Sequence, residues 1–256
     1  MYSIKAHAKV NIFLKITGYE AGYHTLLSRF MRVENLYDTI TFVPGVFEQF
    51  TIEGCPGVPR ESNTIYKAFV ALNKYLDNPI LIHFFLNHKV VVDKQIPSQA
   101  GLGGGSSDAA AFMRLANEVF GLKIDSDALA KIGSEVGADL PFFIYNYPSA
   151  NVKGFGEIVQ PFFETPLPLE LYTPDIGCDT AIVYKTFKKY LLKQINPGSF
   201  FGWENLNSRT LLNIVSDPVV LNDLYPAALI AYPELEALDT EGWFFSGSGS
   251  TFFRLS

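Results

Sequence analysis

Apolar and polar residues alternate at the start of the chain. Every second residue from Ile4 to Ile16 is apolar, and the positions between them hold Lys5, His7, Lys9, Asn11, Phe13 and Lys15. A period of two over this length predicts a half-buried β-strand. Lys9 and Asn11 would then share one face of that strand.

Shorter apolar runs and helical spacings divide the rest of the chain. Further strands are predicted at 30–34, 38–43, 49–52 and 80–92, and two strands at 243–255 enclose the small-residue loop 246–250. Helices are predicted at 63–76, 107–120, 126–136, 179–194, 206–215 and 221–231. Strands and helices that do not alternate strictly indicate an α+β fold. Prolines become frequent after residue 141, so we expect two domains, residues 1–150 and residues 151–256.

The composition narrows the class of protein. Among the 256 residues, 26 are acidic and 20 basic, so the net charge of −6 argues against a nucleic-acid partner. No apolar run is long enough for a transmembrane helix, and the first residues lack the apolar core of a signal peptide. The two cysteines, Cys55 and Cys178, have no metal-site spacing and suggest free thiols. We therefore expect a cytoplasmic protein that binds neither nucleic acid nor membranes.

A glycine-rich loop carries the strongest chemical signal. It consists of Pro97, Ser98, Gln99, Ala100, Gly101, Leu102, Gly103, Gly104, Gly105, Ser106 and Ser107. Glycines let the backbone turn and let a ligand approach closely. An alanine-rich helix follows, with Ser106 or Ser107 as its expected cap, and the N-terminus of a helix favours a phosphate.

The loop does not fit three common phosphate motifs. No lysine follows the glycines as in a P-loop, and Ser106 stands where the dinucleotide-binding pattern requires glycine. The catalytic triplets of protein kinases are also missing from the sequence. The second small-residue loop, 246–250, is by itself only a hairpin turn, but two such loops could close on one polyphosphate.

Three segments together resemble the motifs of the GHMP kinases, a family of small-molecule kinases. They are Ala8-Lys9-Val10-Asn11, the loop 97–107, and Gly247-Ser248-Gly249-Ser250. The resemblance narrows to a branch acting on a cytidine-diphosphate sugar alcohol through Gly22-Tyr23-His24 and the segments 136–141, 154–157 and 222–224. It implies ATP-dependent phosphorylation of an alcohol. It also implies an N-terminal ribosomal-protein-S5-like domain and a C-terminal ferredoxin-like domain, with the active site in the cleft between them.

The resemblance assigns a role to each candidate residue. Lys9 and Asp139 would be catalytic, with Asp139 taking the hydroxyl proton; from the sequence alone, an Asp in a Gly-Ala-Asp-Leu-Pro turn is more often a backbone cap. Asn63 and Lys94 would line the adenine pocket, and the loop 97–107 would wrap the phosphates. The remaining substrate-binding residues would be Asn11, Tyr23, His24, Tyr184, Gly247 and Ser248.

Magnesium is expected with the nucleotide, because it bridges phosphate oxygens in phosphoryl transfer. The sequence shows no protein cage for it, although Ser106 or Ser107 could supply a hydroxyl ligand. His83 and His88 have no partner spacing and are predicted to be structural, on a strand.

Two alternatives stay open from the sequence. A kinase for homoserine or phosphomevalonate is disfavoured by Gly22-Tyr23-His24, which those branches do not share. A nucleotide-binding module without activity should have lost Lys9 or Asp139, and both are present. The sequence does not distinguish a monomer from a dimer.

Overall fold

The computed structural model describes residues 1–256, which fold into two compact units that are interleaved along the chain. The first unit contains residues 1–8, 34–96 and 103–146, and the second contains residues 9–33, 97–102 and 147–256. The strand β1 (Tyr2–Glu20), the strand β2 (Tyr23–Pro44) and the glycine-rich loop each contribute to both units. One crossing, from Asn146 to Tyr147, lies near the predicted boundary at residue 150. The domains 1–150 and 151–256 themselves stay a prediction, as does a cleft between them.

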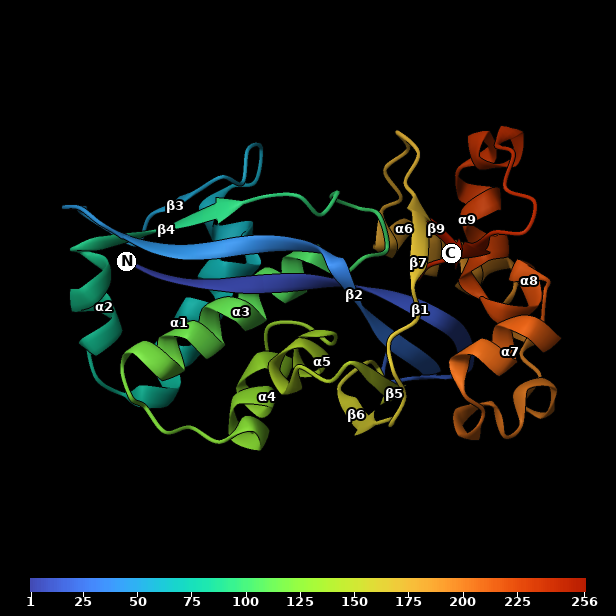
Figure 1. The fold of residues 1–256 in the computed structure, drawn as a ribbon, viewed down its shortest axis with the longest axis horizontal. Helices are drawn as coiled ribbons and strands as arrows, with labels where there is room; N and C mark the ends of the chain where they lie inside the picture. Colours follow the sequence, from blue (N-terminus) through green and yellow to red (C-terminus); the bar gives the residue numbers. More distant parts are fainter. The chain divides into compact units, whose positions relative to one another are not determined.

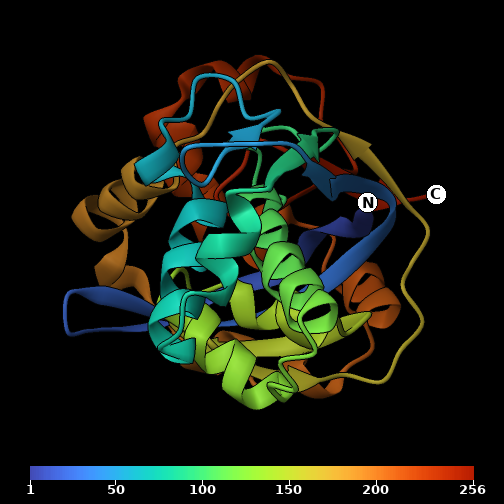
Figure 2. The ribbon, with the colours of Figure 1, turned by 90° about the vertical axis from the view of Figure 1, so that its left-hand side faces the viewer.

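The first unit packs helices against a small sheet. The end of β2 pairs antiparallel with β4 (His88–Asp93), which pairs parallel with β3 (Ile52–Glu53). The helices are α1 (Thr64–Leu76), α2 (Ile80–Phe85), α3 (Gly104–Val119), α4 (Ser126–Ser134) and α5 (Leu140–Tyr145). Both views of the ribbon place α1 and α3 side by side on one side of β4 (Figures 1 and 2).

Aromatic side chains fill the core of this unit. The rings of Phe42 and Phe85 meet edge to face with centroids 5.0 Å apart, and the rings of Phe50 and Phe69 stack at 4.0 Å. Such pairs contribute about 0.5–1.5 kcal/mol each beyond the burial of their area. The core therefore holds α1, whose first turn lies beside the glycine-rich loop, in a fixed position.

The second unit contains two groups of strands. The start of β2 pairs with β5 (Ser149–Gly154), which pairs with β6 (Ile158–Pro161). A separate sheet has the order β7-β9-β8, with β7 at Leu169–Tyr172, β8 at Phe244–Phe245 and β9 at Phe252–Leu255. The helices are α6 (Thr180–Tyr190), α7 (Ser208–Ile214), α8 (Pro218–Leu221) and α9 (Leu224–Ala231), and α6 packs against α9.

The mixed α+β class is confirmed, while several predicted elements need correction. The predicted strand 80–92 begins as helix α2, so His83 is helical, and the three strands predicted between residues 30 and 52 are one long strand and the short β3. Neither Ser106 nor Ser107 caps α3, because the helix begins at Gly104 with Gly103 at the cap position. The ribosomal-protein-S5-like and ferredoxin-like assignments stay predictions. No helix has the length and apolar character needed to span a membrane.

Candidate active site

The two glycine-rich loops meet in the second unit. A Cβ atom built on Gly101 would lie 2.1 Å from the carbonyl oxygen of Ser246, closer than any real contact. The hydroxyl of Ser246 donates to the carbonyl of Gly101 at 3.1 Å, and the backbone N–H of Thr251 donates to the carbonyl of Ala100 at 3.1 Å. The sequence suggested that these loops could act together, and the structure brings these parts of them into direct contact.

The ammonium group of Lys9 lies at the point where the two loops meet. Lys9 is only 4% exposed, and its Nζ donates to the Oδ1 of Asn11 at 2.5 Å and to the carbonyl of Gly101 at 2.9 Å. Gly247 lies against the same amide, because a Cβ built on it would be 3.1 Å from the Oδ1 of Asn11. These contacts hold the ammonium of Lys9, a buried side chain, at the junction of the two loops.

Asn11 is held from both sides. Its Nδ2 donates to the Oγ of Ser28 at 2.9 Å, and its backbone N–H donates to the Oγ of Ser246 at 3.2 Å. Asn222 supports the second loop, since its Nδ2 donates to the carbonyls of Phe245 and Gly247. Ser28, Asn222 and Ser246 were not predicted as site residues. Ser246 and Asn222 do lie in segments that the sequence singled out, the loop 246–250 and the segment 222–224, whereas Ser28 is marked only as a polar residue within an apolar segment.

An aromatic cluster surrounds His24 in the same unit. The imidazole ring lies 4.9 Å from the ring of Tyr19, 5.2 Å from that of Tyr184 and 5.6 Å from that of Phe187, measured between centroids. Its Nε2 atom is buried and has no hydrogen-bond partner. Burial, with an added contribution from the charge of Lys188, lowers the pKa of His24 below 6.5. The structure thus joins two predicted residues, His24 and Tyr184.

Two further predicted residues of the second unit, Tyr23 and Ser248, make contacts of their own. Tyr23 is exposed, and its ring contacts Phe155 at 5.7 Å. The hydroxyl of Ser248 lies 2.8 Å from that of Thr180, the first residue of α6. The helix that carries Tyr184 is therefore tied to the C-terminal glycine-rich loop.

In the first unit, the second half of the loop 97–107 forms the N-terminus of α3. Gly103 adopts a left-handed conformation with φ 72°, which glycine accepts without strain. The hydroxyl of Thr64 donates to the carbonyl of Gly105 at 2.7 Å, so α1 and α3 begin side by side. Ser107 is buried and its hydroxyl donates to the carbonyl of His7 at 2.7 Å. Ser106 lies beside Gly137, where a Cβ would be 4.0 Å from the Ser106 Oγ.

Lys94 forms a buried cluster with two carboxyl groups. Its Nζ donates to Asp38 at 2.6 Å and to Asp108 at 3.0 Å, and a Cβ on Gly104 would lie 3.3 Å from it. Asp38 also accepts the backbone N–H groups of Gln95 and Ile96. Although burial opposes the charge of Lys94, Asp108 and Asp38 raise the pKa of Lys94. This cluster fixes the segment that leads into the glycine-rich loop.

A pocket of about 220 Å³ adjoins Asn63, and its other lining residues are Gln49, Phe50, Thr51, Ile52, Cys55, Val58 and Arg60. It is smaller than pockets that bury a whole drug-sized molecule, which suits a nucleobase. The Oδ1 of Asn63 accepts the N–H of Ile65 and caps α1. Burial raises the pKa of the Cys55 thiol, so this wall of the pocket is uncharged.

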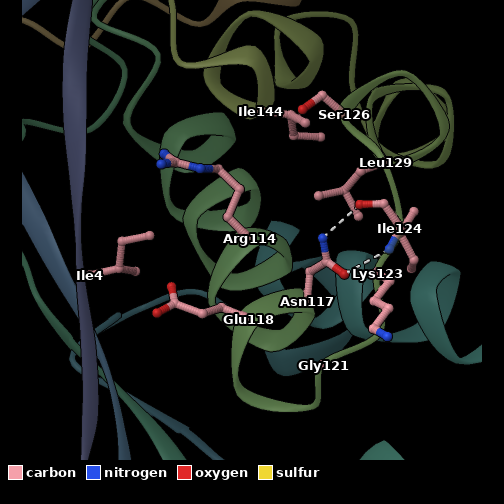
Figure 3. Close-up of a pocket in the computed structure, with 10 residues that line it drawn as sticks. All are labelled: Ile4, Arg114, Asn117, Glu118, Gly121, Lys123, Ile124, Ser126, Leu129 and Ile144. Carbon is pink, nitrogen blue, oxygen red and sulfur yellow. Dashed lines mark hydrogen bonds between the residues drawn. The ribbon is translucent and has the colours of Figure 1, made fainter.

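A larger pocket of about 380 Å³ contains none of the predicted site residues. It lies at the C-terminal half of α3 and the start of α4, and Asn117 closes the loop there by hydrogen bonds to both backbone groups of Ile124 (Figure 3). Asn117 therefore has a structural role in this pocket.

Asp139 stands at the N-terminus of α5 without capping it. No hydrogen bond joins its carboxylate to the first turn of the helix, and Pro141 follows within that turn. The ordinary structural role of an Asp in such a turn is thus not the one it performs here. Lys9 belongs to the second unit and Asp139 to the first, and their apposition stays a prediction.

The chain is similar to known proteins of one family. The model of the GHMP kinases N terminal domain matches residues 63–147. A curated relative, the 4-diphosphocytidyl-2-C-methyl-D-erythritol kinase of Sulfurovum sp. (strain NBC37-1), is 71% identical over 255 residues, covering 100% of this chain and 99% of the relative. The kinase of the same name from Sulfurimonas denitrificans is 44% identical, covering 98% of this chain and 96% of that protein.

A solved structure shows the same fold over nearly the full length. The crystal structure of 4-(cytidine 5'-diphospho)-2C-methyl-D-erythritol kinase has a TM-score of 0.72 and 29% identity, covering 99% of this chain and 90% of that one. Full-length identity of this degree shows common descent, so the chain belongs to the 4-diphosphocytidyl-2-C-methyl-D-erythritol kinase branch of the GHMP kinase family.

Proposed function

We propose that the protein transfers the γ-phosphoryl group of ATP to the 2-hydroxyl of 4-diphosphocytidyl-2-C-methyl-D-erythritol, a step in the formation of isoprenoid precursors by the methylerythritol phosphate route. The observation that carries this proposal is the buried Lys9 ammonium at the junction of two glycine-rich loops. Phosphoryl transfer depends mainly on positioning and on neutralising charge, and this junction supplies both.

Each residue then has a defined task. Asp139 accepts the proton of the substrate hydroxyl, and Lys9 stabilises the oxygen as negative charge develops on it. That oxygen attacks the γ-phosphorus, the bond to the β-phosphate oxygen breaks, and ADP leaves with that electron pair. The phosphates are bound by backbone N–H groups of the loop 97–107, including those at the N-terminus of α3.

The adenine and cytosine bases would occupy separate places. The 220 Å³ pocket beside Asn63 suits adenine. The cluster around His24 suits cytosine, because a polar group of the base would supply the hydrogen bond that the buried Nε2 lacks. Tyr23 and Tyr184 would contribute aromatic surface to this site, where stacking is worth roughly 1–3 kcal/mol per base.

The residues fit a magnesium ion bound through ATP. No group of three His, Cys, Asp or Glu side chains is arranged to hold a metal, and Mg²⁺ in such enzymes is bound largely by phosphates and water. The Ser106 hydroxyl would be its protein ligand, because the Ser107 hydroxyl is already bonded to His7. Bound there, the ion would neutralise phosphate charge.

A measurement of ADP release with a panel of acceptors tests the function. We expect turnover with the cytidine-diphosphate sugar alcohol and little with homoserine, phosphomevalonate or galactose, because only the first presents a base to His24. The variant Asp139→Asn should retain ATP binding, and its turnover should fall by roughly 10²–10⁴-fold. Equal turnover with homoserine, or full activity of the variant, would contradict the proposal.

A further inference from the structure

Two side chains outside the predicted site hold the ring of His24. Lys188, on α6, donates from Nζ to the hydroxyl of Tyr19 at 2.6 Å and lies 4.3 Å from the centroid of the Tyr19 ring. The Tyr19 ring in turn meets the imidazole edge to face at 4.9 Å. Lys188 thus clamps Tyr19, and Tyr19 covers one side of His24.

The clamp also determines the charge next to the imidazole. The titratable groups around His24 are the phenols of Tyr19 and Tyr184 and the ammonium of Lys188; Phe187, the fourth neighbour, is apolar. Phenols are uncharged at neutral pH, so the formal charge that acts on the ring is positive. Together with burial, it disfavours a second positive charge on His24.

The charge of His24 matters for reading a base. A neutral imidazole has one N–H donor and one lone pair, whereas an imidazolium has two donors and no acceptor. Cytosine presents an exocyclic amino group where uracil presents a carbonyl oxygen. Only the neutral ring can accept a hydrogen bond from that amino group. The charged ring can only donate, which would suit the carbonyl oxygen of uracil.

We propose that Lys188 and Tyr19 are positioning residues that keep the His24 ring oriented and uncharged, so that the site selects cytosine over uracil. The inference rests on the proposed function, since it concerns the base of the same substrate. It assigns a role to two residues that none of the motifs contains.

The chain offers a matched control one residue away. Lys189 lies on the same helix and is exposed like Lys188, but its ammonium lies over the ring of Tyr190. Lys188→Met and Lys189→Met therefore remove the same charge from the same helix. Tyr19→Phe removes the hydroxyl that accepts from Lys188 and keeps the ring.

The first measurement is an NMR titration of the imidazole nitrogens in the full chain, with His24→Gln to assign the signal among the four histidines. We expect His24 of the unmodified protein to titrate below pH 6.5. The midpoint should move to higher pH in Lys188→Met and in Tyr19→Phe, and stay in place in Lys189→Met. Identical midpoints in Lys188→Met and Lys189→Met would overturn the role of Lys188.

The second measurement is the steady-state kinetics of the same proteins with the cytidine substrate and its uridine analogue. As pH falls through the midpoint of His24, KM for the cytidine substrate should rise by about fivefold, the effect of losing one hydrogen bond. In Lys188→Met this rise should begin at higher pH and discrimination against the uridine analogue should shrink, while kcat and KM for ATP stay unchanged. A cytidine KM that ignores pH and both variants would overturn base selection by His24.

The two measurements separate the possible failures. An unmodified protein that does not turn over the cytidine substrate overturns the proposed function, and base selection with it. The titration still reports in that case whether Lys188 controls His24. Turnover that is normal with an unresponsive titration overturns the inference alone.

Discussion

Asp108 is a carboxyl group placed where its charge is poorly compensated. It is buried at the start of α3, and its Oδ1 atom has no hydrogen-bond partner. Burial raises the pKa of Asp108 to about 7, against the pull of Lys94 and with a further contribution from Asp38. The folded protein therefore binds a proton at this site more tightly than the unfolded chain does.

The raised pKa of Asp108 makes the stability of the folded protein depend on pH. An Asp with a raised pKa costs the folded state stability as pH rises from about 4 to about 7, because the unfolded chain loses its proton first. Asp108→Asn removes this cost, and Lys94 keeps Asp38 as its partner. We expect the variant to gain on the order of 1 kcal/mol relative to the unmodified protein between pH 5 and pH 8.

Denaturant unfolding at pH 5 and at pH 8 checks this expectation. Glu118→Gln is the matched control, because it makes the same chemical change on the same helix at an exposed position. Its effect should be small and independent of pH. A free-energy difference for Asp108→Asn that is the same at both pH values would refute the charge argument.

At the scale of single residues, the sequence identifies chemical types better than partners. Lys9 and Asn11 were correctly expected on one face of a strand, and both are buried in the structure. The choice of Ser106 over Ser107 as the proposed magnesium ligand depends on the backbone carbonyl of His7. That carbonyl accepts the Ser107 hydroxyl and lies one hundred positions away from Ser107 in the sequence. Spacing within the motif holds no information on such a contact.

At the scale of elements, the loop around Gly101 combines two constraints that can be separated experimentally. Gly101 has φ +72° and meets the carbonyl of Ser246, whereas Gly242, in the same unit, has φ +74° and open space around it. Gly242→Ala should cost roughly 1–2 kcal/mol, the penalty for a left-handed non-glycine residue. Gly101→Ala should cost clearly more, because a loop must also move, and it should weaken ATP binding.

Thermal unfolding and calorimetric titration with ATP measure both effects. Gly242→Ala is expected to bind ATP normally. If the two variants lost the same stability and bound ATP equally well, close packing of the loops would not be needed for the nucleotide site.

The elements that the sequence mispredicts have a common physical origin. The run 80–85 is short and apolar, and periodicity cannot separate helix from strand over six residues. The burial of Leu81 and Phe85, four residues apart, favours a helix, and the Asn78 Oδ1 accepts a hydrogen bond from the N–H of Ile80 at its start. Likewise, β1 alternates in sequence, but from Ala8 to Ile16 both of its faces are buried. Polar residues there lie inside the protein rather than in solvent.

At the scale of the whole molecule, the chain departs from a linear order of domains. The glycine-rich loop passes from the second unit to the first between Leu102 and Gly103, and β1 passes the other way between Ala8 and Lys9. Within the second unit, the fully buried Arg29 pairs with Glu164 and donates to the carbonyl of Glu204. The two contacts of Arg29 join positions more than a hundred residues apart, so local sequence patterns could not predict them.

Lys9 and Asp139 belong to different units of the chain. If both act on the same hydroxyl oxygen, removing either disables the step, and removing the second costs little more. We expect Lys9→Met and Asp139→Asn each to lower kcat by roughly 10²–10⁴-fold, and the double variant to resemble the weaker single variant. Lys5→Met is the control, because Lys5 lies on β1 at an exposed position over the ring of Tyr37. In the double variant of Lys5→Met and Asp139→Asn, the two fold-losses in kcat should multiply, as for independent sites. If the fold-losses also multiplied in the double variant of Lys9→Met and Asp139→Asn, the two residues would act on separate steps.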